Sequence, residues 1–374
     1  MTPRQRLLAA LSCAPVDTVP VSPRIWAYCL WKGMGELDCA ERFGYDPYTT
    51  AGGLGTPLTS PFCEGMVFSH DVRVEIRRRR DGAKTTAERT FRTPGGTLHD
   101  VLVMPDARRE YGIGPNPEWS EPLVKSHEDA RLLPYVLPGP ERMSMQHFRQ
   151  VEKEWGERGL VLMRTSAGTD HVAIDAMGIA NAMLYLYDDE SLFDEVFRVA
   201  DDWNVSLMKV ALEGGARYFF DSFFNMSLSA GWSPEVWRRK VLPLVKHHVE
   251  LVHSYGGRLV LYDDGRIMGI MDMVAEAGVD ALQTVAPPPI GDADFAALKR
   301  AHGGKICFWG GVDLALILRG TPREVEAQAR EVIEKLGPTG LILGTSDSIR
   351  DGSPDENVRA FCDAGRRYGR AGAR

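Results

Sequence analysis

The chain has 374 residues, of which 44% are hydrophobic and 25% charged, a globular composition that excludes disordered, collagen-like and disulfide-scaffold proteins. Its 44 Lys and Arg against 51 Asp and Glu give a formal charge of −7, which disfavours nucleic acid and anionic membranes as partners. The sequence contains no apolar run of about 18 residues for a membrane span, and its first residues lack the apolar stretch of a secretory signal, so we expect a cytoplasmic protein.

The six cysteines are scattered along the chain and form no Cys-x-x-Cys pair. This pattern is typical of reduced thiols and disfavours both a disulfide frame and a cysteine-based zinc site. The residues are Cys13, Cys29, Cys39, Cys63, Cys307 and Cys362.

Short apolar runs that alternate with longer helical stretches predict a parallel sheet covered by helices. The first short run lies at 19–22, and the alternation becomes regular after Gly159. The predicted strands of the regular part are 160–165, 217–221, 257–263, 280–285, 305–310 and 340–345. One more strand in 40–70 or 129–137 would make eight, so we expect a (β/α)8 TIM barrel that forms a single domain over 1–374.

Two helix starts are marked by a hydroxyl residue that is followed by proline. These are Ser233-Pro234 and Thr321-Pro322. The hydroxyl can cap the free amides of the first turn, and proline is tolerated at the first helical position. We expect the first of these helices to run over 233–255.

Residues 60–125 break the alternation with polar and apolar residues in turn, separated by turn signals at 81–82 and 94–96. This pattern predicts an antiparallel β insertion in the barrel. The basic run 77–80 lies within it, and we interpret that run as a solvated strand edge that resists aggregation.

Acidic and polar side chains follow several of the predicted strands. In a barrel of this type the reacting groups come from the carboxyl ends of the strands and the loops after them. The segments concerned are Asp221-Ser222, Tyr262-Asp263-Asp264-Gly265, Gln283-Thr284, Asp313 and Thr345-Ser346-Asp347.

Each of these acids alone has a structural interpretation, as a turn residue before Gly265 or as a helix cap at Asp313 or Asp347. Several carboxylates at one barrel mouth raise one another's pKa and so supply a proton donor near neutral pH. The candidate catalytic residues are therefore Asp264, Tyr262, Asp347 and Asp221.

Histidine is sparse in the chain, and only His171 follows a predicted strand end. We interpret His247, His248 and His253, on the helix predicted over 233–255, as surface or packing residues. The aromatic set Trp26, Tyr28 and Trp31 follows the first strand, where it either lines a flat ligand cavity or packs in the interior. The candidate substrate-binding residues are Arg24, Trp26, Tyr28, His171, Ser222, Gln283 and Trp309.

Motifs spread over nearly the whole chain resemble the uroporphyrinogen decarboxylase superfamily. They are MTPRQRLLAAL (1–11), PVDTVPV (15–21), GGVD (310–313), RGTPREV (319–325) and PDENV (354–358). The resemblance implies a TIM barrel and one of two chemistries, cofactor-free decarboxylation of uroporphyrinogen or methyl transfer to or from corrinoid proteins.

The thiol-alkylating methyltransferases of this superfamily carry His-x-Cys-Gly and a later Cys as zinc ligands. The corresponding stretches here read Tyr262-Asp263-Asp264-Gly265 and Thr345-Ser346-Asp347, so the soft ligands are missing. Zinc lowers the pKa of a thiol best through thiolate and imidazole ligands. We therefore expect no zinc site of that kind and name no metal ligands among the site residues. Whether a metal ion binds through oxygen ligands is left open.

True uroporphyrinogen decarboxylases carry an Arg-x-x-x-Arg pair after the first strand. Here only Arg24 is kept, and Tyr28 stands where the second arginine belongs. A substrate with eight carboxylates demands a strongly cationic cleft, which the acids of this chain oppose. Asp221-Ser222 does resemble the decarboxylase Phe-Asp-Ser motif, whose serine is a substrate contact, whereas the decarboxylase histidine near the last strand is absent.

The resemblance and the acids together favour a corrinoid-dependent methyltransferase or O-demethylase that acts on a small molecule with general-acid help. Its cofactor is cobalamin carried on a separate partner protein. One alternative is a cofactor-free decarboxylase of a small or aromatic acid or a porphyrinogen, in which Arg24 binds the acid and Asp221 or Asp264 gives the proton. Another is a non-catalytic barrel in a methyl-transfer complex. Whether the chain forms a homodimer is left open.

Overall fold

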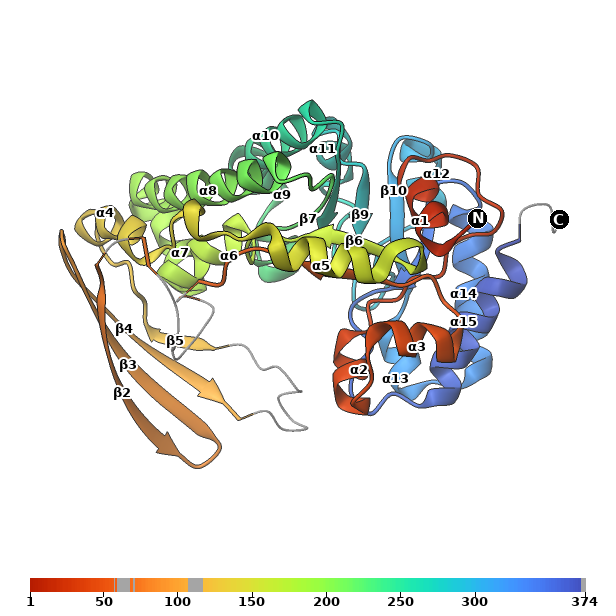
Figure 1. The fold of residues 1–374 in the computed structure, drawn as a ribbon, viewed down its shortest axis with the longest axis horizontal. Helices are drawn as coiled ribbons and strands as arrows, with labels where there is room; N and C mark the ends of the chain where they lie inside the picture. Colours follow the sequence, from red (N-terminus) through yellow and green to blue (C-terminus); the bar gives the residue numbers. More distant parts are fainter. Residues whose placement is uncertain (57, 59–67, 70, 107–116, 371–374) are drawn as a thin grey trace. The chain divides into compact units, whose positions relative to one another are not determined.

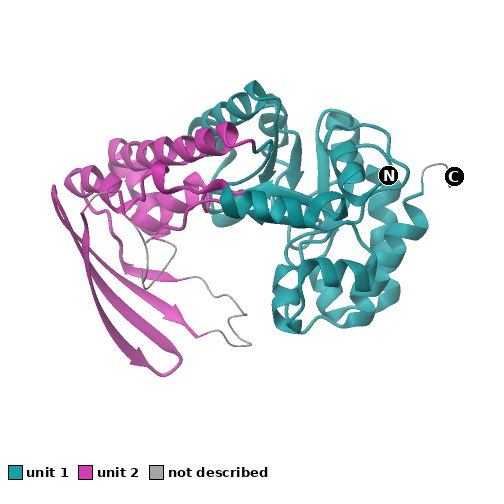
Figure 2. Ribbon diagram, in the orientation of Figure 1, with its two compact units in different colours: residues 1–51, 146–163, 216–374 teal, residues 52–145, 164–215 magenta. Residues whose placement is uncertain are grey.

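The computed structural model describes residues 1–374 except 57, 59–67, 70, 107–116 and 371–374 (Figure 1). The chain divides into two compact units (Figure 2). The first unit consists of residues 1–51, 146–163 and 216–374, and the second of residues 52–145 and 164–215.

A seven-stranded, wholly parallel sheet forms the centre of the first unit. The strands, in their order across the sheet, are β1 (Tyr48–Ala51), β6 (Leu160–Met163), β7 (Tyr218–Ser222), β8 (Arg258–Tyr262), β9 (Ala281–Gln283), β10 (Cys307–Val312) and β11 (Leu341–Thr345). The six strands predicted after Gly159 are all found, with ends that differ by at most two residues. Continuous apolar runs therefore identified the buried parallel strands correctly.

The two regions proposed for a further strand have different structures. Region 40–70 contains β1, whereas 129–137 lies almost entirely in helix α4 (His127–Val136). The side chain of Ser126 accepts a hydrogen bond from the amide of Asp129 and so caps this helix. The strand alternative for 129–137 is therefore wrong.

The strand predicted at 19–22 is reduced to one parallel bridge between Val21 and Leu343 of β11. The Ser22 amide donates to the Leu343 carbonyl at 2.8 Å, and the Asp46 amide, just before β1, donates to the Val21 carbonyl at 2.7 Å. Pro20 and Pro23 have no amide hydrogen and cannot extend this ladder. The expected eight-stranded barrel is therefore a seven-stranded sheet with this short bridging segment beside β11.

Alternate residues of the strands form the hydrophobic core of the first unit. The cluster contains Leu160, Leu162, Phe220, Val260, Tyr262, Ala281, Cys307, Trp309 and Ile342, together with Leu7, Ala10 and Leu11 of the first helix and Val16. Because successive side chains of a strand point to opposite faces, the residues between these ones face the helices.

Helices accompany the strands of the first unit (Figure 1). They are α1 (Pro3–Leu11), α2 (Trp26–Lys32), α3 (Glu36–Phe43), α5 (Met145–Trp155), α9 (Pro234–Val236), α10 (Leu242–Ser254), α11 (Met271–Glu276), α12 (Phe295–His302), α13 (Leu314–Arg319), α14 (Pro322–Leu336) and α15 (Asp355–Tyr368). Both predicted caps are confirmed, since Ser233 caps α9 and Thr321 forms a capping box with Glu324 at the start of α14.

The helix predicted over 233–255 is not one continuous α-helix. A π-helical turn (Trp237–Val241) separates α9 from α10. Pro243 is the second residue of α10 and cannot donate the hydrogen bond that an α-helix requires at this position. The missing donor accounts for a wider turn here.

The second unit contains the predicted antiparallel insertion, a sheet of β2 (Arg73–Asp81), β3 (Lys84–Thr93), β4 (Gly96–Pro105) and β5 (Glu118–Glu121) in that order. Its helices are α4, α6 (Thr169–Met177), α7 (Ile179–Asp188) and α8 (Glu190–Glu213). The basic run 77–80 lies on the edge strand β2 and is exposed. Among the described helices of the chain, none has the length and apolarity to cross a membrane.

A buried ion pair holds β3 and β4 of this sheet together. Arg89 and Asp100 are both fully buried, and Arg89 Nε donates to Asp100 Oδ1 at 2.8 Å. The indole nitrogen of Trp119 on β5 donates to the other carboxylate oxygen at 3.3 Å. Such a pair is costly to break, because removal of one partner leaves the other charge buried.

Arg89→Met is expected to lower the free energy of unfolding by about 3–5 kcal/mol, since Asp100 loses its counter-charge in a dry interior. The exposed Arg79→Met is the matched control and is expected to change this energy by less than about 0.5 kcal/mol. Urea unfolding, with hydrogen exchange of the β3 amides as a local probe, measures both. The double variant Arg89→Met/Asp100→Leu should regain most of the loss, and equal stability of Arg89→Met and wild type would contradict the argument.

Candidate active site

Four of the predicted site residues lie in one row across the parallel sheet. The strand register pairs Ser222 with Tyr262, Tyr262 with Gln283, and Gln283 with Trp309. Residues paired in this way share a face, and Tyr262 and Trp309 belong to the interior cluster. The row lies at or near the carboxyl ends of β7 to β10, the edge at which TIM-barrel enzymes carry their reacting groups.

Three charged side chains surround the ring and hydroxyl of Tyr262. The guanidinium carbon of Arg24 lies 4.3 Å from the ring centroid, a cation–π contact. The Tyr262 hydroxyl donates a hydrogen bond of 3.4 Å to Asp347 Oδ1, and the same side chain interacts with Asp264. We call Arg24, Tyr262, Asp264 and Asp347 the Tyr262 cluster. The structure thus brings together four residues that the sequence proposed from three separate segments.

Arg24 is a cation with unused donor capacity. Its Nη1 lies 4.0 Å from Asp347 Oδ1, too far for a hydrogen bond, and this atom is buried without a hydrogen-bond partner among the described residues. Burial opposes the charge, yet the neighbouring Tyr262, Tyr48, Asp347 and Asp264 hold the pKa of Arg24 above its ordinary value. A ligand oxygen or anion would satisfy this donor.

Asp264 contributes to the cluster a carboxyl group whose pKa is shifted. Burial raises the pKa of its carboxyl group to about 6; the hydrogen bond from Tyr262 and the charge of Arg24 act against this, and the charge of Asp347 adds to it. The residue sits in a tight turn because Gly265 has φ of +73°, and a Cβ there would lie 2.1 Å from Ser229 Oγ. The turn role is therefore seen at this position, and the role of Asp264 as an acid stays a prediction.

Asp347 is the more solvated acid of the two. Its side chain is 32% exposed, and its Oδ2 lies 3.5 Å from Arg350 Nη2. Its Oδ1 also accepts from the amide of Ser348 at 2.6 Å. The two acids thus differ in environment, since Asp347 contacts a guanidinium and a backbone amide, whereas burial dominates at Asp264.

Tyr48 of the edge strand β1 contacts two residues of the row across the sheet. It is not among the site residues predicted from the sequence. Its hydroxyl donates to Gln283 Oε1 at 3.2 Å, and its ring contacts Trp309 edge-on with centroids 4.5 Å apart. Burial raises the pKa of Tyr48 to about 12. The sequence predicts a strand somewhere in 40–70, which includes Tyr48. It does not fix the ends of that strand or the face to which each side chain points, so Tyr48 could not be identified.

Asp221 lies on the opposite face of its strand from the row. It alternates with Phe220 and Ser222, and its Oδ2 is 2.7 Å from Nδ1 of His248 on α10. Both side chains are buried, with exposures of 7% and 0%. From the sequence, His248 is interpreted as a surface or packing residue, and its contact with Asp221 is not predicted. Because side chains alternate along a strand, the position of Asp221 between Phe220 and Ser222 already places it on the face away from Tyr262.

The aromatic residues predicted after the first strand differ in their exposure to solvent. Tyr28 is fully buried and its hydroxyl donates to Asp355 Oδ1 of α15 at 2.6 Å, so its polar group is already engaged. Its ring packs edge-on against Trp31 and Phe43. Trp26 begins α2 and is 39% exposed. Interior packing, the second of the two interpretations, describes Tyr28.

His171 and Asp313, two further predicted residues, each contact a residue of the helix to which they belong or which they cap. His171 belongs to the second unit, on α6, where its Nε2 lies 3.0 Å from Asp175 of the same helix. Burial opposes its charge, but Asp175 holds the pKa of His171 above its ordinary value. Asp313 accepts from the amide of Ala315 at 2.8 Å, which confirms its interpretation as the cap of α13.

The donor set of the Tyr262 cluster does not fit a zinc ion. It offers a phenol and two carboxylates, no thiolate or imidazole, and the guanidinium of Arg24 lies among them, where it would repel a cation. Within the part of the chain that the structure describes, no three His, Cys, Asp or Glu side chains are grouped to hold a metal ion.

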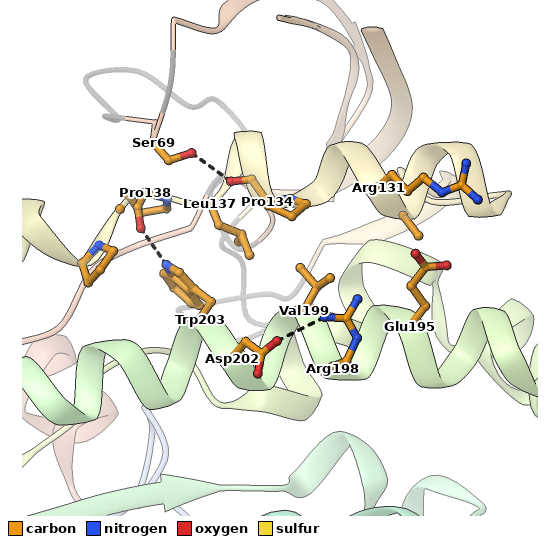
Figure 3. Close-up of a pocket in the computed structure, with 13 residues that line it drawn as sticks. Ser69, Arg131, Pro134, Leu137, Pro138, Glu195, Arg198, Val199, Asp202 and Trp203 are labelled. Carbon is orange, nitrogen blue, oxygen red and sulfur yellow. Dashed lines mark hydrogen bonds and ion pairs between the residues drawn. The ribbon is translucent and has the colours of Figure 1, made fainter. Parts of the chain in front are cut away.

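A cavity of about 550 Å³ lies in the second unit between α4 and α8 (Figure 3). Its charged rim is internally paired, with Arg198 Nη1 3.2 Å from Asp202 and Glu195 2.6 Å from His127. The indole of Trp203 donates to the Pro138 carbonyl at 2.6 Å. None of the predicted site residues lines this cavity, so it is not the candidate site.

Comparison with known proteins gives a family and a fold. A family model described as uroporphyrinogen decarboxylase matches residues 109–368. The uroporphyrinogen decarboxylase of Gloeobacter violaceus is 28% identical over 134 residues, which cover 34% of this chain and 36% of that protein. The Synechococcus sp. enzyme of the same name is 27% identical over 154 residues, covering 40% and 41%. These matches span well under half of either relative.

A solved methyltransferase from Methanosarcina mazei matches with a TM-score of 0.62 over 98% of this chain and 99% of that one. The sequence identity is 17%, so the match concerns the fold alone.

Asp264→Asn is expected to be more stable than the wild type at pH 8 by about 1–3 kcal/mol in free energy of unfolding. The carboxyl pKa is raised to about 6 in the fold from 3.8, so the folded protein favours the protonated acid. The wild type loses this stability as the pH rises through 6, and the amide does not. Urea unfolding at pH 4, 6 and 8 measures the difference, which should vanish near pH 4.

The matched control is Asp71→Asn, at an exposed position before β2. Its free energy of unfolding should stay within about 0.5 kcal/mol of wild type at all three pH values. A stability gain of Asp264→Asn that is the same at pH 4 and pH 8 would show that Asp264 is not held protonated.

Proposed function

Because the chain belongs to the uroporphyrinogen decarboxylase family, we propose that it catalyses acid-assisted transfer of a methyl group from the oxygen of a small aromatic methyl ether. The acceptor would be a corrinoid on a separate protein. The observation that carries the proposal is the half-buried Asp264, with a pKa of about 6, beside the Tyr262 hydroxyl and the cation of Arg24.

An ether oxygen is a poor leaving group unless its developing charge is neutralised. In the proposed step the O–CH3 bond breaks, the electron pair remains on oxygen, and the Asp264 proton moves to that oxygen to give a phenol. The free Nη1 of Arg24 can donate a hydrogen bond to the same oxygen as charge develops. Solvent then returns a proton to the Asp264 carboxylate.

The methyl acceptor has to come from outside the cluster. A phenol, two carboxylates and a guanidinium include no soft nucleophile, and Cys307 is fully buried in the barrel interior. The residues present suit the leaving-group half of the reaction. A partner-borne corrinoid would supply the nucleophile that takes the methyl group.

The walls of the site suit an uncharged aromatic substrate. The rings of Phe220 and Phe224 lie with their centroids 5.5 and 6.2 Å from that of Tyr262, and Tyr48 contacts Trp309 in a T-shaped arrangement. Such rings bind a flat apolar molecule and exclude water from the acid. A porphyrinogen with many carboxylates would meet one buried arginine and two acids, which is poor electrostatic complementarity.

A second candidate is decarboxylation of a small aromatic acid. The free donor of Arg24 suits a single carboxylate as well as an ether oxygen. The C–C bond to the carboxylate would break, carbon dioxide would leave, and the Asp264 proton would move to the remaining carbanion. Asp221 is the poorer proton donor for this step because it faces α10.

Asp264→Asn is expected to lower methyl transfer by about 10²–10⁴-fold, the usual contribution of a positioned general acid. The assay adds free cob(I)alamin as acceptor and 2-methoxyphenol or 4-methoxybenzoate as donor, and it follows loss of the cob(I)alamin absorbance. Asp71→Asn is the control and should keep wild-type turnover. Wild-type turnover by Asp264→Asn would reject Asp264 as the acid, and carbon dioxide release from 4-methoxybenzoate without corrinoid would favour the decarboxylase.

The rate is expected to fall with rising pH above about 6, since only protonated Asp264 can assist the leaving oxygen. A plot of log kcat/KM against pH from 5 to 9 should approach a slope of about −1 on its alkaline side. Asp264→Asn should lose this break. A rate that rises through pH 6 would indicate that the residue acts as a base, contrary to the proposal.

A further inference from the structure

The buried pair Asp221–His248 joins the end of β7 to helix α10. The Asp221 carboxylate uses both oxygens, since Oδ2 lies 2.7 Å from His248 Nδ1 and Oδ1 accepts the Ser222 amide at 3.0 Å. His248 is fully buried, and its ring lies 6.1 Å from that of Phe223. The contact therefore links one helix to three consecutive residues of the strand end.

The residues on either side of this anchor hold Tyr262. Phe220 precedes Asp221 and Phe224 follows it by three residues, and both rings contact the Tyr262 ring. The Phe223 amide also donates to the Tyr262 carbonyl at 3.0 Å. The position of the β7 end thus sets both the ring contacts and a backbone contact of Tyr262.

Tyr262 in turn orders the charged groups of the cluster. Arg24 lies over its ring, its hydroxyl hydrogen-bonds Asp347, and the same side chain interacts with Asp264. A displacement of the ring would change the burial of Asp264 and the distance between the carboxyl groups, because these groups meet through the Tyr262 side chain.

From these contacts we infer that Asp221 and His248 are a positioning pair, which anchors the end of β7 to α10 and thereby holds Tyr262 in contact with Asp264. Asp221 lies on the strand face opposite to Ser222 and contacts α10, so the pair acts on the cluster through the end of β7. The inference deepens the proposed function and rests on it for the role of Asp264 as the acid, while the contacts themselves are independent of the reaction.

The test is the pKa of Asp264 in the substrate-free protein, measured by 13C NMR of labelled aspartate carboxyl groups and assigned with Asp264→Asn. His248→Phe keeps a buried ring but removes the bond to Asp221. It should lower the Asp264 pKa by about one unit toward its ordinary value, because a loosened Tyr262 lets water reach the acid. His248→Asn keeps an N–H donor near the Nδ1 position and should leave the pKa close to wild type.

The matched control is His247→Phe, an exposed neighbour on the same helix, which should leave the Asp264 pKa unchanged. Should His248→Phe fail to fold, the nearly isosteric Asp221→Asn takes its place. Its amide cannot accept from both His248 and Ser222, so it should lower the pKa in the same direction. A folded His248→Phe or Asp221→Asn with reduced stability but an unchanged Asp264 pKa would show a merely structural pair and overturn the inference.

These results separate the inference from the proposed function. The NMR titration needs no substrate, so absence of methyl transfer in the wild type would reject the proposed reaction and leave the positioning role standing. An unchanged pKa in the variants would reject the positioning role and leave the reaction standing. In the methyl-transfer assay, His248→Phe should move the alkaline break of the pH profile downward together with the NMR pKa.

Discussion

The half-buried guanidinium of Arg24 is the constraint on which the rest of the site depends. A charge at this depth requires compensation, and it receives it from the face of the Tyr262 ring at 4.3 Å and from the carboxylate of Asp347 at 4.0 Å. Neither contact is a hydrogen bond to Nη1, which keeps a donor for a ligand. The same cation limits how far the pKa of Asp264 can rise, so the acid titrates in the range where proton donation and recovery are both practicable.

The alternation of side chains along each strand decides which polar groups take part. Ser222, Tyr262, Gln283 and Trp309 share the interior face of adjacent strands, while Asp221 faces α10. Two carboxylates at the ends of adjacent strands therefore have different partners. Asp264 follows its strand in a turn and reaches Tyr262, whereas Asp221 lies within its strand and is committed to His248.

Most of the fold was predictable from the sequence, because buried parallel strands consist of continuous apolar runs and because capping residues mark where helices begin. The exceptions have local causes: Pro20 and Pro23 shorten the first strand to a bridge, and a capped helix occupies the alternative strand region 129–137. In the site, residues after strand ends were identified because topology alone brings them to one edge. The surroundings of Tyr48, Tyr28 and Asp221 could not be predicted in the same way. They depend on the register of the strands and on which side of a helix faces the sheet, and tertiary packing sets both.

The cluster also bears on the acids that stand where the sequence resemblance implies thiolate and imidazole ligands. Activation of a thiol acceptor requires a Lewis acid, and its ligands must be soft and free of nearby cations. Departure of an oxygen leaving group requires a proton and a cation close to that oxygen, which Asp264 and Arg24 can supply. A site cannot be arranged for both, because the arginine that favours an oxyanion opposes a metal ion at the same place. Under the proposed function, acids in place of metal ligands would assist departure of the oxygen leaving group and not activation of a thiol acceptor.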